Sequence, residues 1–269
     1  MPDFIYDIPT ATLAIVFIIS TLSAVGVGIF IGKPLVRLLL GSGPDFNESI
    51  DYVTSGFSLF YGLLLGLLTV AAYENSERVK ESILNEATSL GSLYSQLNIY
   101  PEPFRSDAKW SIRDYVLYTV HKEWPAHRKG RILNGGYNRA EAIRRHLAEF
   151  EPQTRPEEIV HTEVISSFQE FSDSRQRRLA GVVTAIPNIL WDAVLIGAGT
   201  STLLMTILRI RVRQHIVLGS VTALFLAVIL FVITILDRPL RGEAALKPEP
   251  FVLLWSRSMV WDEPLSERF

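Results

Sequence analysis

The stretch VTSGFSLFYGLLLGLLTVAAYENSERVKESILNEATSLGSLYSQL, from Val53 to Leu97, decides the fold. Up to Tyr73 it carries no charge, over about the 20 residues that a helix needs to cross a bilayer. Beyond Tyr73 charges appear, and apolar residues recur every three or four positions, which indicates one face of a helix. These residues are Val79, Ile83, Ala87, Leu90, Tyr94 and Leu97. No helix breaker separates the two parts, so we expect one helix that leaves the membrane and continues beyond it.

Three further apolar segments match the first part of this stretch in character. They are Pro9–Ile31, Ile189–Leu208 and Ile216–Leu236, and within them only Asp192 is charged. Four segments of this kind predict four membrane-spanning helices. The acidic start MPDFIYDIP lacks the basic region of a signal peptide, so we interpret the first segment as a retained span.

The polar chain between the second and third spans is also predicted to be helical. One helix is expected over Ser106–Trp124, closed by Pro125. The segment RKGRILNGGYN reads as a loop with a Gly-Gly turn. Next, Asn138 with Glu141 has the spacing of a capping box and predicts the start of a short basic helix.

A longer helix is predicted to start at the capping-box pair Thr154 and Glu157. Nothing breaks this helix before Pro187, so it too is expected to continue towards the membrane. Its predicted inward residues are Val160, Val164, Phe168 and Phe171.

The fold class is therefore an all-α integral membrane protein with a helical extramembrane domain between the second and third spans. No strand-like alternation occurs in the middle region. The expected divisions are a helix pair over 1–73, the helical domain over 74–181, a second helix pair over 182–236 and an extended or partner-bound tail over 237–269. The helical domain is continuous with the second and third spans, so it is one unit with them and not a module on a linker.

Small residues recur at every fourth position on three spans. They are Ala24, Gly28 and Gly32, then Gly62 and Gly66, then Gly219, Ala223 and Ala227. Such rows let helices approach closely in lipid. Packing within one subunit is the favoured interpretation, and a contact between subunits is the alternative.

Basic residues near the span ends leave the orientation open. One side carries five of them: Lys33, Arg37, Arg209, Arg211 and Arg213. The other side carries eight: Arg78, Lys80, Arg175, Arg177, Arg178, Arg238, Arg241 and Lys247. The larger number favours a cytoplasmic helical domain, whereas the concentration in the short loop and the acidic N-terminus favour the reverse.

Composition excludes several classes of chemistry. The net charge of -2 does not point to nucleic acid, and the absence of cysteine removes thiolate metal sites and a cysteine nucleophile. The histidines have no metal-binding spacing; they are His121, His127, His146, His161 and His215. No phosphate loop or catalytic set appears, so we expect no catalytic residue, no metal and no cofactor, and thus not an enzyme.

Several motifs together resemble the bestrophin-like family of bacterial and plant membrane proteins, and more distantly the bestrophins. The motifs are FYGLLLGLLTVAAYE, NEATSL with Glu86, YTVHKEW with Glu123 and Trp124, RQRRLAGVVTAIPNILW, and LDRPLRG. Together with the order of spans they cover nearly the whole chain. The acidic cluster of the calcium clasp of animal bestrophins has no clear counterpart here, which puts calcium gating in doubt.

The resemblance implies a pentameric anion channel whose pore is lined by the second span. It implies a multi-pass protein, in the inner membrane of a bacterium, with its helical domain in the cytoplasm. The implied partners are membrane lipid, further copies of the same chain and inorganic anions such as chloride, and no nucleic acid.

One stripe of the second span is the candidate pore lining: Phe57, Phe60, Tyr61, Leu64 and Leu68. A ring of apolar side chains around a pore can gate by dewetting. The alternative for this stripe is contact with lipid or packing between helices.

Five charged residues are candidates for a charged ring or a structural network: Arg177, Arg178, Glu86, Glu123 and Asp192. The two arginines could concentrate anions at a pore mouth, or anchor a helix at the interface. The two glutamates are expected on solvated faces; if buried, each needs a partner such as an arginine. Asp192 is expected in the first turn of the third span at the bilayer edge, with Trp191 beside it in the aromatic belt; the alternative is a deep, functional acid.

Two functions remain open from the sequence. The first is an anion channel formed by a homo-oligomer. The second is a non-conducting membrane scaffold or sensor whose helical domain binds a partner.

Overall fold

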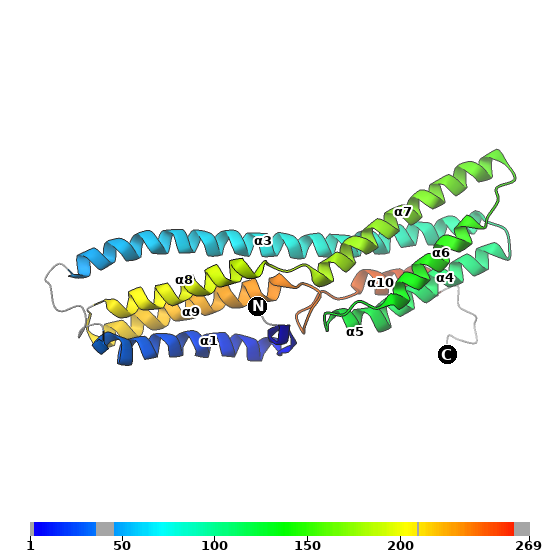
Figure 1. The fold of residues 1–269 in the computed structure, drawn as a ribbon. Coiled ribbons are helices and arrows are strands. Elements are labelled where there is room, and N and C mark those ends of the chain that lie inside the picture. Colours follow the sequence, from blue (N-terminus) through cyan, green and yellow to red (C-terminus); the bar gives the residue numbers. More distant parts are fainter. Residues whose placement is uncertain (1–2, 36–45, 209, 261–269) are drawn as a thin grey trace. The chain divides into compact units, whose positions relative to one another are not determined.

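The structure is a computed structural model that describes residues 3–35, 46–208 and 210–260 (Figure 1). Every secondary-structure element in these ranges is helical, which confirms the all-α fold class. The chain divides into two compact units. Unit 1 comprises residues 1–75 and 185–237, and unit 2 comprises residues 76–184 and 238–269. Two of the basic loop residues used above, Arg37 and Arg209, lie outside the described ranges.

Unit 1 is a bundle of membrane-type helices that lie side by side in Figure 1. Its elements are the short 3-10 turn Asp3–Asp7, α1 (Thr10–Val27) with the π-helical turn Gly28–Gly32, the first part of α3 (Phe46–Gln96), α8 (Asn188–Ile207) and α9 (Val212–Asp237). Four helices of the described chain are long and apolar enough to span a membrane, which confirms the four predicted spans.

The glycine rows of the first and fourth spans serve packing within the protomer. A methyl group at Gly28 would collide with Thr206 of α8, and one at Gly219 would lie 2.7 Å from Val25 of α1. On α3 the situation is opposite, because nothing lies within 4 Å of a side chain added at Gly62 or Gly66. The favoured interpretation therefore holds for α1 and α9, and the row on α3 faces away from the protomer.

Unit 2 is a soluble-type helical bundle. It contains the second part of α3, the turn Leu97–Ile99, α4 (Phe104–Tyr118), the π-helical turn Thr119–Glu123, α5 (Trp124–His127), α6 (Asn134–Ala148), α7 (Arg155–Val183), α10 (Glu249–Leu254) and the π-helical turn Trp255–Met259. Its core includes the whole apolar face predicted for α3, from Val79 to Leu97. The predicted continuation of the second span is confirmed, since α3 runs without interruption from Phe46 to Gln96.

Two local predictions in unit 2 are wrong. Pro125 does not close the helix of α4. It lies in the first turn of α5, where the backbone N–H that proline lacks would have no partner within the helix. Likewise α6 begins at Asn134 and not at Asn138, so the pair Asn138 and Glu141 caps nothing. The reason lies in tertiary packing, because Gly135 and Gly136 bring the first turn of α6 too close to its neighbours for any side chain.

The predicted start of α7 is confirmed. Thr154 Oγ1 accepts a hydrogen bond from the Glu157 amide at 3.3 Å, and Glu157 Oε2 accepts one from the Thr154 amide at 3.2 Å, which is a complete capping box. However, α7 ends at Val183, before Pro187, and α8 restarts at Asn188 with Pro187 as its cap residue. The predicted helix therefore stops four residues before Pro187, and α8 is a separate helix.

The buried carboxylate of Asp237 holds the start of α8 in place. Its oxygens accept hydrogen bonds from the Ile186 amide at 2.5 Å, from Trp191 Nε1 at 3.3 Å and from the Tyr6 hydroxyl. Three donors satisfy a buried charge at the end of α9 and fix the backbone that precedes α8. Trp191 is therefore buried and does not lie in an aromatic belt.

The tail differs from the predicted extended segment. Glu249–Leu254 forms α10, and the π-helical turn Trp255–Met259 follows it. Phe251 and Met259 are fully buried in the core of unit 2. Trp124 Nε1 also donates to the Leu246 carbonyl at 2.8 Å, so this part of the tail belongs to the helical unit.

Candidate functional site

The outer face of α3 in unit 1 does not coincide with the predicted pore stripe. Tyr61 and Leu68 are buried in the unit 1 core, and Phe57 and Leu64 pack against that core. The Tyr61 hydroxyl donates to the Val194 carbonyl at 3.0 Å. Of the five predicted residues only Phe60 is open, with 72% of its surface exposed. Burial inside the protomer removes Tyr61 and Leu68 from any pore surface.

A different face of α3 is uncovered in the protomer. It carries large apolar residues with more than half of their surface exposed: Tyr52, Leu59, Leu63, Leu67 and Val70. Gly62 and Gly66 lie along the same face with nothing within 4 Å. This face points away from the core residues of α3 at helical spacing, with Phe60 at its edge. It is the surface that lipid or a second copy of the chain can reach.

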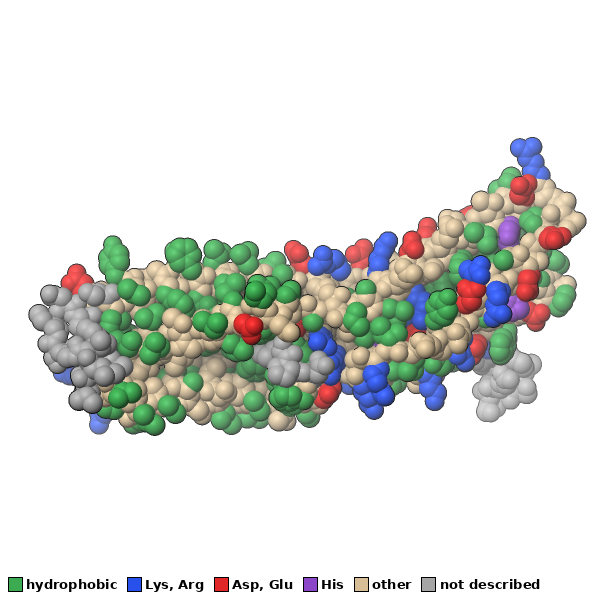
Figure 2. Space-filling model, viewed as in Figure 1, with side chains coloured by type: hydrophobic (Ala, Val, Ile, Leu, Met, Phe, Trp, Pro, Cys, Tyr) green, Lys and Arg blue, Asp and Glu red, His purple; other side chains and the backbone are tan. Residues whose placement is uncertain are grey.

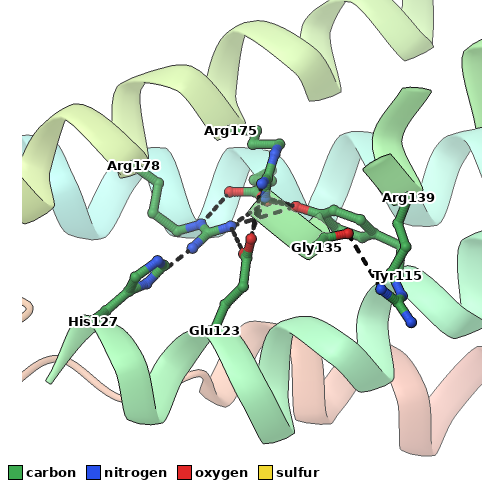
Figure 3. A network of polar contacts seen from close by, with 8 residues as sticks. Tyr115, Glu123, His127, Gly135, Arg139, Arg175 and Arg178 are labelled. Carbon is green, nitrogen blue, oxygen red and sulfur yellow. Dashed lines mark hydrogen bonds and ion pairs between the residues drawn. The ribbon is translucent and has the colours of Figure 1, made fainter. Parts of the chain in front are cut away.

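A buried ionic network joins four helices of unit 2, namely α3, α4 with its π-helical turn, α5 and α7 (Figure 3). Glu86 comes from α3, Tyr115 and Glu123 from α4 and its π-helical turn, His127 from α5, and Arg175 and Arg178 from α7. All six side chains are buried. The structure thus selects the buried, paired alternative for Glu86 and Glu123, and the favoured expectation of solvated glutamates was wrong.

Arg178 is the centre of this network. Its Nε donates to Glu86 Oε2 at 2.6 Å, and its Nη2 donates to Glu86 Oε1 at 3.0 Å and to Glu123 Oε2 at 3.1 Å. Its Nη1 lies 3.3 Å from Nδ1 of His127. The planar guanidinium also lies over the Trp124 ring, at 5.2 Å from the ring centre. One arginine therefore ties together the helices that carry Glu86, Glu123 and His127.

Arg175 completes the network on the other side of Glu123. Its Nη2 donates to Glu123 Oε1 at 2.8 Å, and its Nη1 donates to Glu123 Oε2 at 3.0 Å and to the Tyr115 hydroxyl at 2.7 Å. The Tyr115 hydroxyl in turn donates to Glu86. Gly136 borders this pair so closely that a Cβ there would collide with the Glu123 carboxylate. Glycine at the start of α6 is thus required by the network.

The electrostatics favour a neutral, closed cluster. Two carboxylates face two guanidinium groups, so the formal charges cancel. Burial opposes ionisation of Glu123, but hydrogen bonds from Arg175 and the charge of Arg178 outweigh it and lower the pKa of Glu123 to about 2. Burial, helped by the positive charge of Arg178, lowers the pKa of His127 to about 3. His127 is therefore neutral at ordinary pH and accepts from Arg178 through Nδ1.

The remaining predicted residues lie outside the network. Arg177 is exposed, and it borders an open groove of about 320 Å³ between α3 and α7. Asp192 is exposed on α8, in the second turn after Asn188. Arg178 cannot form a positive ring or a membrane anchor, because Glu86 neutralises it and its side chain has no exposed surface. Two of the eight basic residues used for the orientation, Arg175 and Arg178, are thereby internal.

No group of three potential metal ligands occurs within the described ranges. The charged side chains of the network are already paired with one another, and that arrangement suits a structural clamp between helices better than binding or transfer of a ligand. The chemistry of the network is thus to fix α3, α4 and α7 against one another.

Arg175, Tyr115 and His127 were not identified as site residues from the sequence. A signal existed for Arg175, because it and Arg178 continue the inward stripe of Val164, Phe168 and Phe171 at steps of three and four residues. A charge on an apolar stripe predicts a buried partner. No comparable signal identifies His127, since its position depends on the π-helical turn before it.

Comparison with known proteins supports the fold and the family. The family model of the bestrophin-like domain matches residues 19–251. No curated protein matches the chain. A solved bacterial bestrophin homologue from Klebsiella pneumoniae has a similar fold, with 12% identity, a TM-score of 0.65, and coverage of 93% of this chain and 99% of that one.

Two other solved structures agree. A variant of a bestrophin homologue from Klebsiella pneumoniae has 13% identity and a TM-score of 0.64, with 90% of this chain and 98% of that one covered. A crystal structure described as a membrane protein has 15% identity and a TM-score of 0.65, with 94% and 99% covered. At such low sequence identities these structures show the fold alone. The family model, in contrast, matches most of the sequence. The chain belongs to the bestrophin-like family.

Proposed function

We propose that the protein is an ion channel assembled from several copies of this chain, with the uncovered face of α3 lining the pore. The observation that carries the proposal is that face itself. It combines exposed Leu59, Leu63 and Val70 with two glycines that contact nothing in the protomer. A row of glycines lets α3 helices of neighbouring copies approach closely, and a ring of leucines gates by dewetting.

Membership in the family supports the same proposal. The predicted pore residues are revised accordingly: Phe60 remains at the edge of the pore face, and Leu63 replaces Tyr61 at its centre. Anion conduction is the finer part of the proposal and rests on the family alone. The first charged residues of α3 after the span, Glu74 and Glu77, are acidic, so the mouth formed by α3 does not by itself favour anions.

The number of subunits and the orientation are also parts of the proposal. A pentamer with the helical unit in the cytoplasm follows from the resemblance to bestrophins. It places the acidic start of the chain and the helical unit on the same side, since the first two spans return the chain to its starting side before the helical unit begins. Particle symmetry of the purified protein in micrographs tests the oligomer, and a clear monomer overturns it.

A matched pair of substitutions tests the pore assignment. Leu63 on α3 and Ile19 on α1 are both 58% exposed. Currents are measured in planar bilayers with the purified chain. Leu63→Ser should raise the single-channel conductance by removing the apolar ring, whereas Ile19→Ser should leave it unchanged. Equal responses, or currents unaffected by either change, would remove α3 from the pore.

The alternative is a non-conducting scaffold whose helical unit binds a partner. Large apolar side chains exposed on unit 2 favour it, above all Trp110 with 66% of its surface exposed. Symmetric particles that carry no current under varied pH, calcium and voltage would select this alternative.

A further inference from the structure

Two basic turns of unit 2 lie against each other. The first is the RKGR segment, Arg128–Arg131, after α5. The second is the RPLR segment, Arg238–Arg241, after α9. Together these two segments contain five basic residues and no acidic residue. In Figure 2 the blue side chains gather over the region that α5 occupies in Figure 1.

Backbone hydrogen bonds hold the two turns together. The Gly242 amide donates to the Arg128 carbonyl at 3.0 Å, and Arg128 Nε donates to the Gly242 carbonyl at 3.0 Å. Gly130 has a φ of 67°, and the Arg241 guanidinium packs so closely on it that an added Cβ would lie 3.2 Å from Nη1. The left-handed backbone favours glycine there, and any side chain would press on the Arg241 guanidinium. The charges are therefore gathered by built turns and not by chance encounters of long side chains.

The side chains of this pair of turns are accessible. Arg128, Lys129 and Arg131 are exposed, and Arg241 is half-buried. The acid directly before this turn, Asp237, is buried and accepts hydrogen bonds from Tyr6, Ile186 and Trp191. Glu243 follows two residues after Arg241 and is exposed. Glu123, just before α5, is buried and fully engaged with Arg175 and Arg178. The five basic residues of the two turns therefore outnumber the acidic residues that flank them along the chain.

Chain connectivity sets this positive charge beside the membrane. The span α9 has 26 residues, about 39 Å of helix, so it exceeds a hydrocarbon core of about 30 Å and its end reaches the lipid headgroups. Arg238 is the next residue. Arg241 is four residues from Asp237, and four residues reach at most about 14 Å. The hydrogen bonds between Arg128 and Gly242 keep Arg128 next to Arg241 within unit 2.

We propose that the two turns, Arg128–Arg131 and Arg238–Arg241, form a binding site for the phosphate headgroups of anionic membrane lipids. Guanidinium groups bind phosphate oxygens in pairs, and clustered basic residues next to a span attract anionic lipid. The proposal depends on the membrane insertion of α9 and is independent of conduction. Failure of the channel proposal would leave it standing.

The test measures lipid retention by native mass spectrometry. The purified full chain is titrated with phosphatidylglycerol or phosphatidylcholine in detergent. The unmodified chain should prefer phosphatidylglycerol, and the double variant Lys129→Gln with Arg131→Gln should bind it roughly tenfold to thirtyfold more weakly, as expected for the loss of two basic contacts. This variant leaves the hydrogen bonds of Arg128 intact.

The matched control removes the same charge elsewhere in the unit. Arg145 and Arg155 are exposed basic residues outside the two turns. Arg145→Gln with Arg155→Gln should keep the preference, and Lys129→Arg with Arg131→Lys should also keep it. If the control variant loses as much affinity for phosphatidylglycerol, the preference comes from the overall charge of the protein, and the proposed site is wrong.

A third arm distinguishes lipid from soluble phosphate. Inorganic phosphate at millimolar concentration should not displace phosphatidylglycerol, because the lipid is also held by its chains. Complete displacement would show a site for a soluble anion and would overturn the lipid assignment. So would the absence of any preference for phosphatidylglycerol over phosphatidylcholine.

Discussion

The two parts of α3 belong to one continuous helix but differ in how their apolar residues are distributed. From Val79 to Leu97 its apolar residues form one stripe, and that stripe is the buried one. From Val53 to Tyr73 apolar residues occur all round the helix, and large ones such as Leu59 and Leu67 are exposed. In water the apolar stripe marks the packed face, because exposing it is costly. In lipid the pattern no longer distinguishes a packed face from a free one.

The two units also differ in how they satisfy their buried polar residues. Unit 2 buries two glutamates and two arginines in one closed network, whereas unit 1 holds Asp237 with neutral donors. A charge pair that is buried in this way stabilises little as a whole, but the loss of one partner leaves the other uncompensated.

The largest effect is expected for Arg178→Met. It leaves the buried Glu86 without its charged partner and should lower the free energy of unfolding by about 3–5 kcal/mol. Chemical unfolding in mixed micelles, followed by far-ultraviolet circular dichroism, measures the change. Arg177→Met, on the next and exposed position of α7, should change it by less than about 0.5 kcal/mol. Similar losses for both would show that the network is not a clamp.

Two glycines give the next largest effect and a direct contrast between the units. Gly136→Ala should destabilise the protein by about 1–3 kcal/mol, since the new methyl group meets the Glu123 carboxylate. Gly62→Ala meets nothing in the protomer, so the unfolding of the detergent-solubilised monomer should not change. It should instead alter oligomer assembly or conductance, measured by mass photometry and in planar bilayers. A Gly62→Ala chain with normal assembly and normal current would contradict the proposed role of this face of α3.

Stability should also depend on pH through His127. Burial and the charge of Arg178 lower its pKa from 6.5 to about 3. Between these two pH values the imidazole is therefore protonated in the unfolded chain and neutral in the folded chain. The stabilisation is complete above pH 6.5 and is lost as the pH falls towards 3. Between pH 6 and 5 the free energy of unfolding should therefore fall, with a contribution from His127 of up to about 1.4 kcal/mol per pH unit.

The control for this dependence is another histidine. His127→Gln should reduce the slope between pH 6 and 5, while the exposed His121→Gln should leave it unchanged. Below pH 4.5 a further loss should follow as Glu123, whose pKa is lowered to about 2, is protonated in the unfolded chain first. If the slope of the free energy of unfolding against pH is the same in His127→Gln, then His127 does not cause this pH dependence.

The contrast between the two parts of α3 also explains which features of the structure can be predicted from the sequence. The four spans, the unbroken α3 and the cap of α7 at Thr154 are local or strongly periodic features, so they were predicted. The start of α6 was missed, because it depends on Tyr118 and Glu123 lying against Gly135 and Gly136. The predicted stripe of α3 proved to be largely buried because apolar residues surround the span, and nothing in their spacing distinguishes buried Tyr61 from exposed Leu63.

The network illustrates the limit more sharply. Glu86 and Glu123 were singled out from the sequence, yet the solvated interpretation was preferred on the general rarity of buried charges. The helical stripe that contains Arg175 and Arg178 carried the missing information. Two opposite charges on the apolar faces of different helices predict each other, whereas either one alone predicts only a solvated residue.

The smallest effect concerns Asp192, whose depth in the membrane stays a prediction. The chain has no cysteine, so Asp192→Cys introduces a single reactive thiol on the exposed face of α8. Stability should change by less than about 0.5 kcal/mol, as for other exposed positions. A membrane-impermeant maleimide should label this thiol in sealed vesicles, because Asp192 is expected at the bilayer edge. Labelling from the cytoplasmic side alone would also support the proposed orientation.

Ile196 provides the matched position for this measurement. It is one helical turn further along α8 on the same face and is 70% exposed in the protomer. Ile196→Cys should react slowly, because it lies about 6 Å deeper at 1.5 Å per residue. If Asp192→Cys is as unreactive as Ile196→Cys, the acid lies within the hydrocarbon. An exposed charge at that depth needs water or a partner from another copy, and Asp192 would then belong to the conduction path or to a subunit contact.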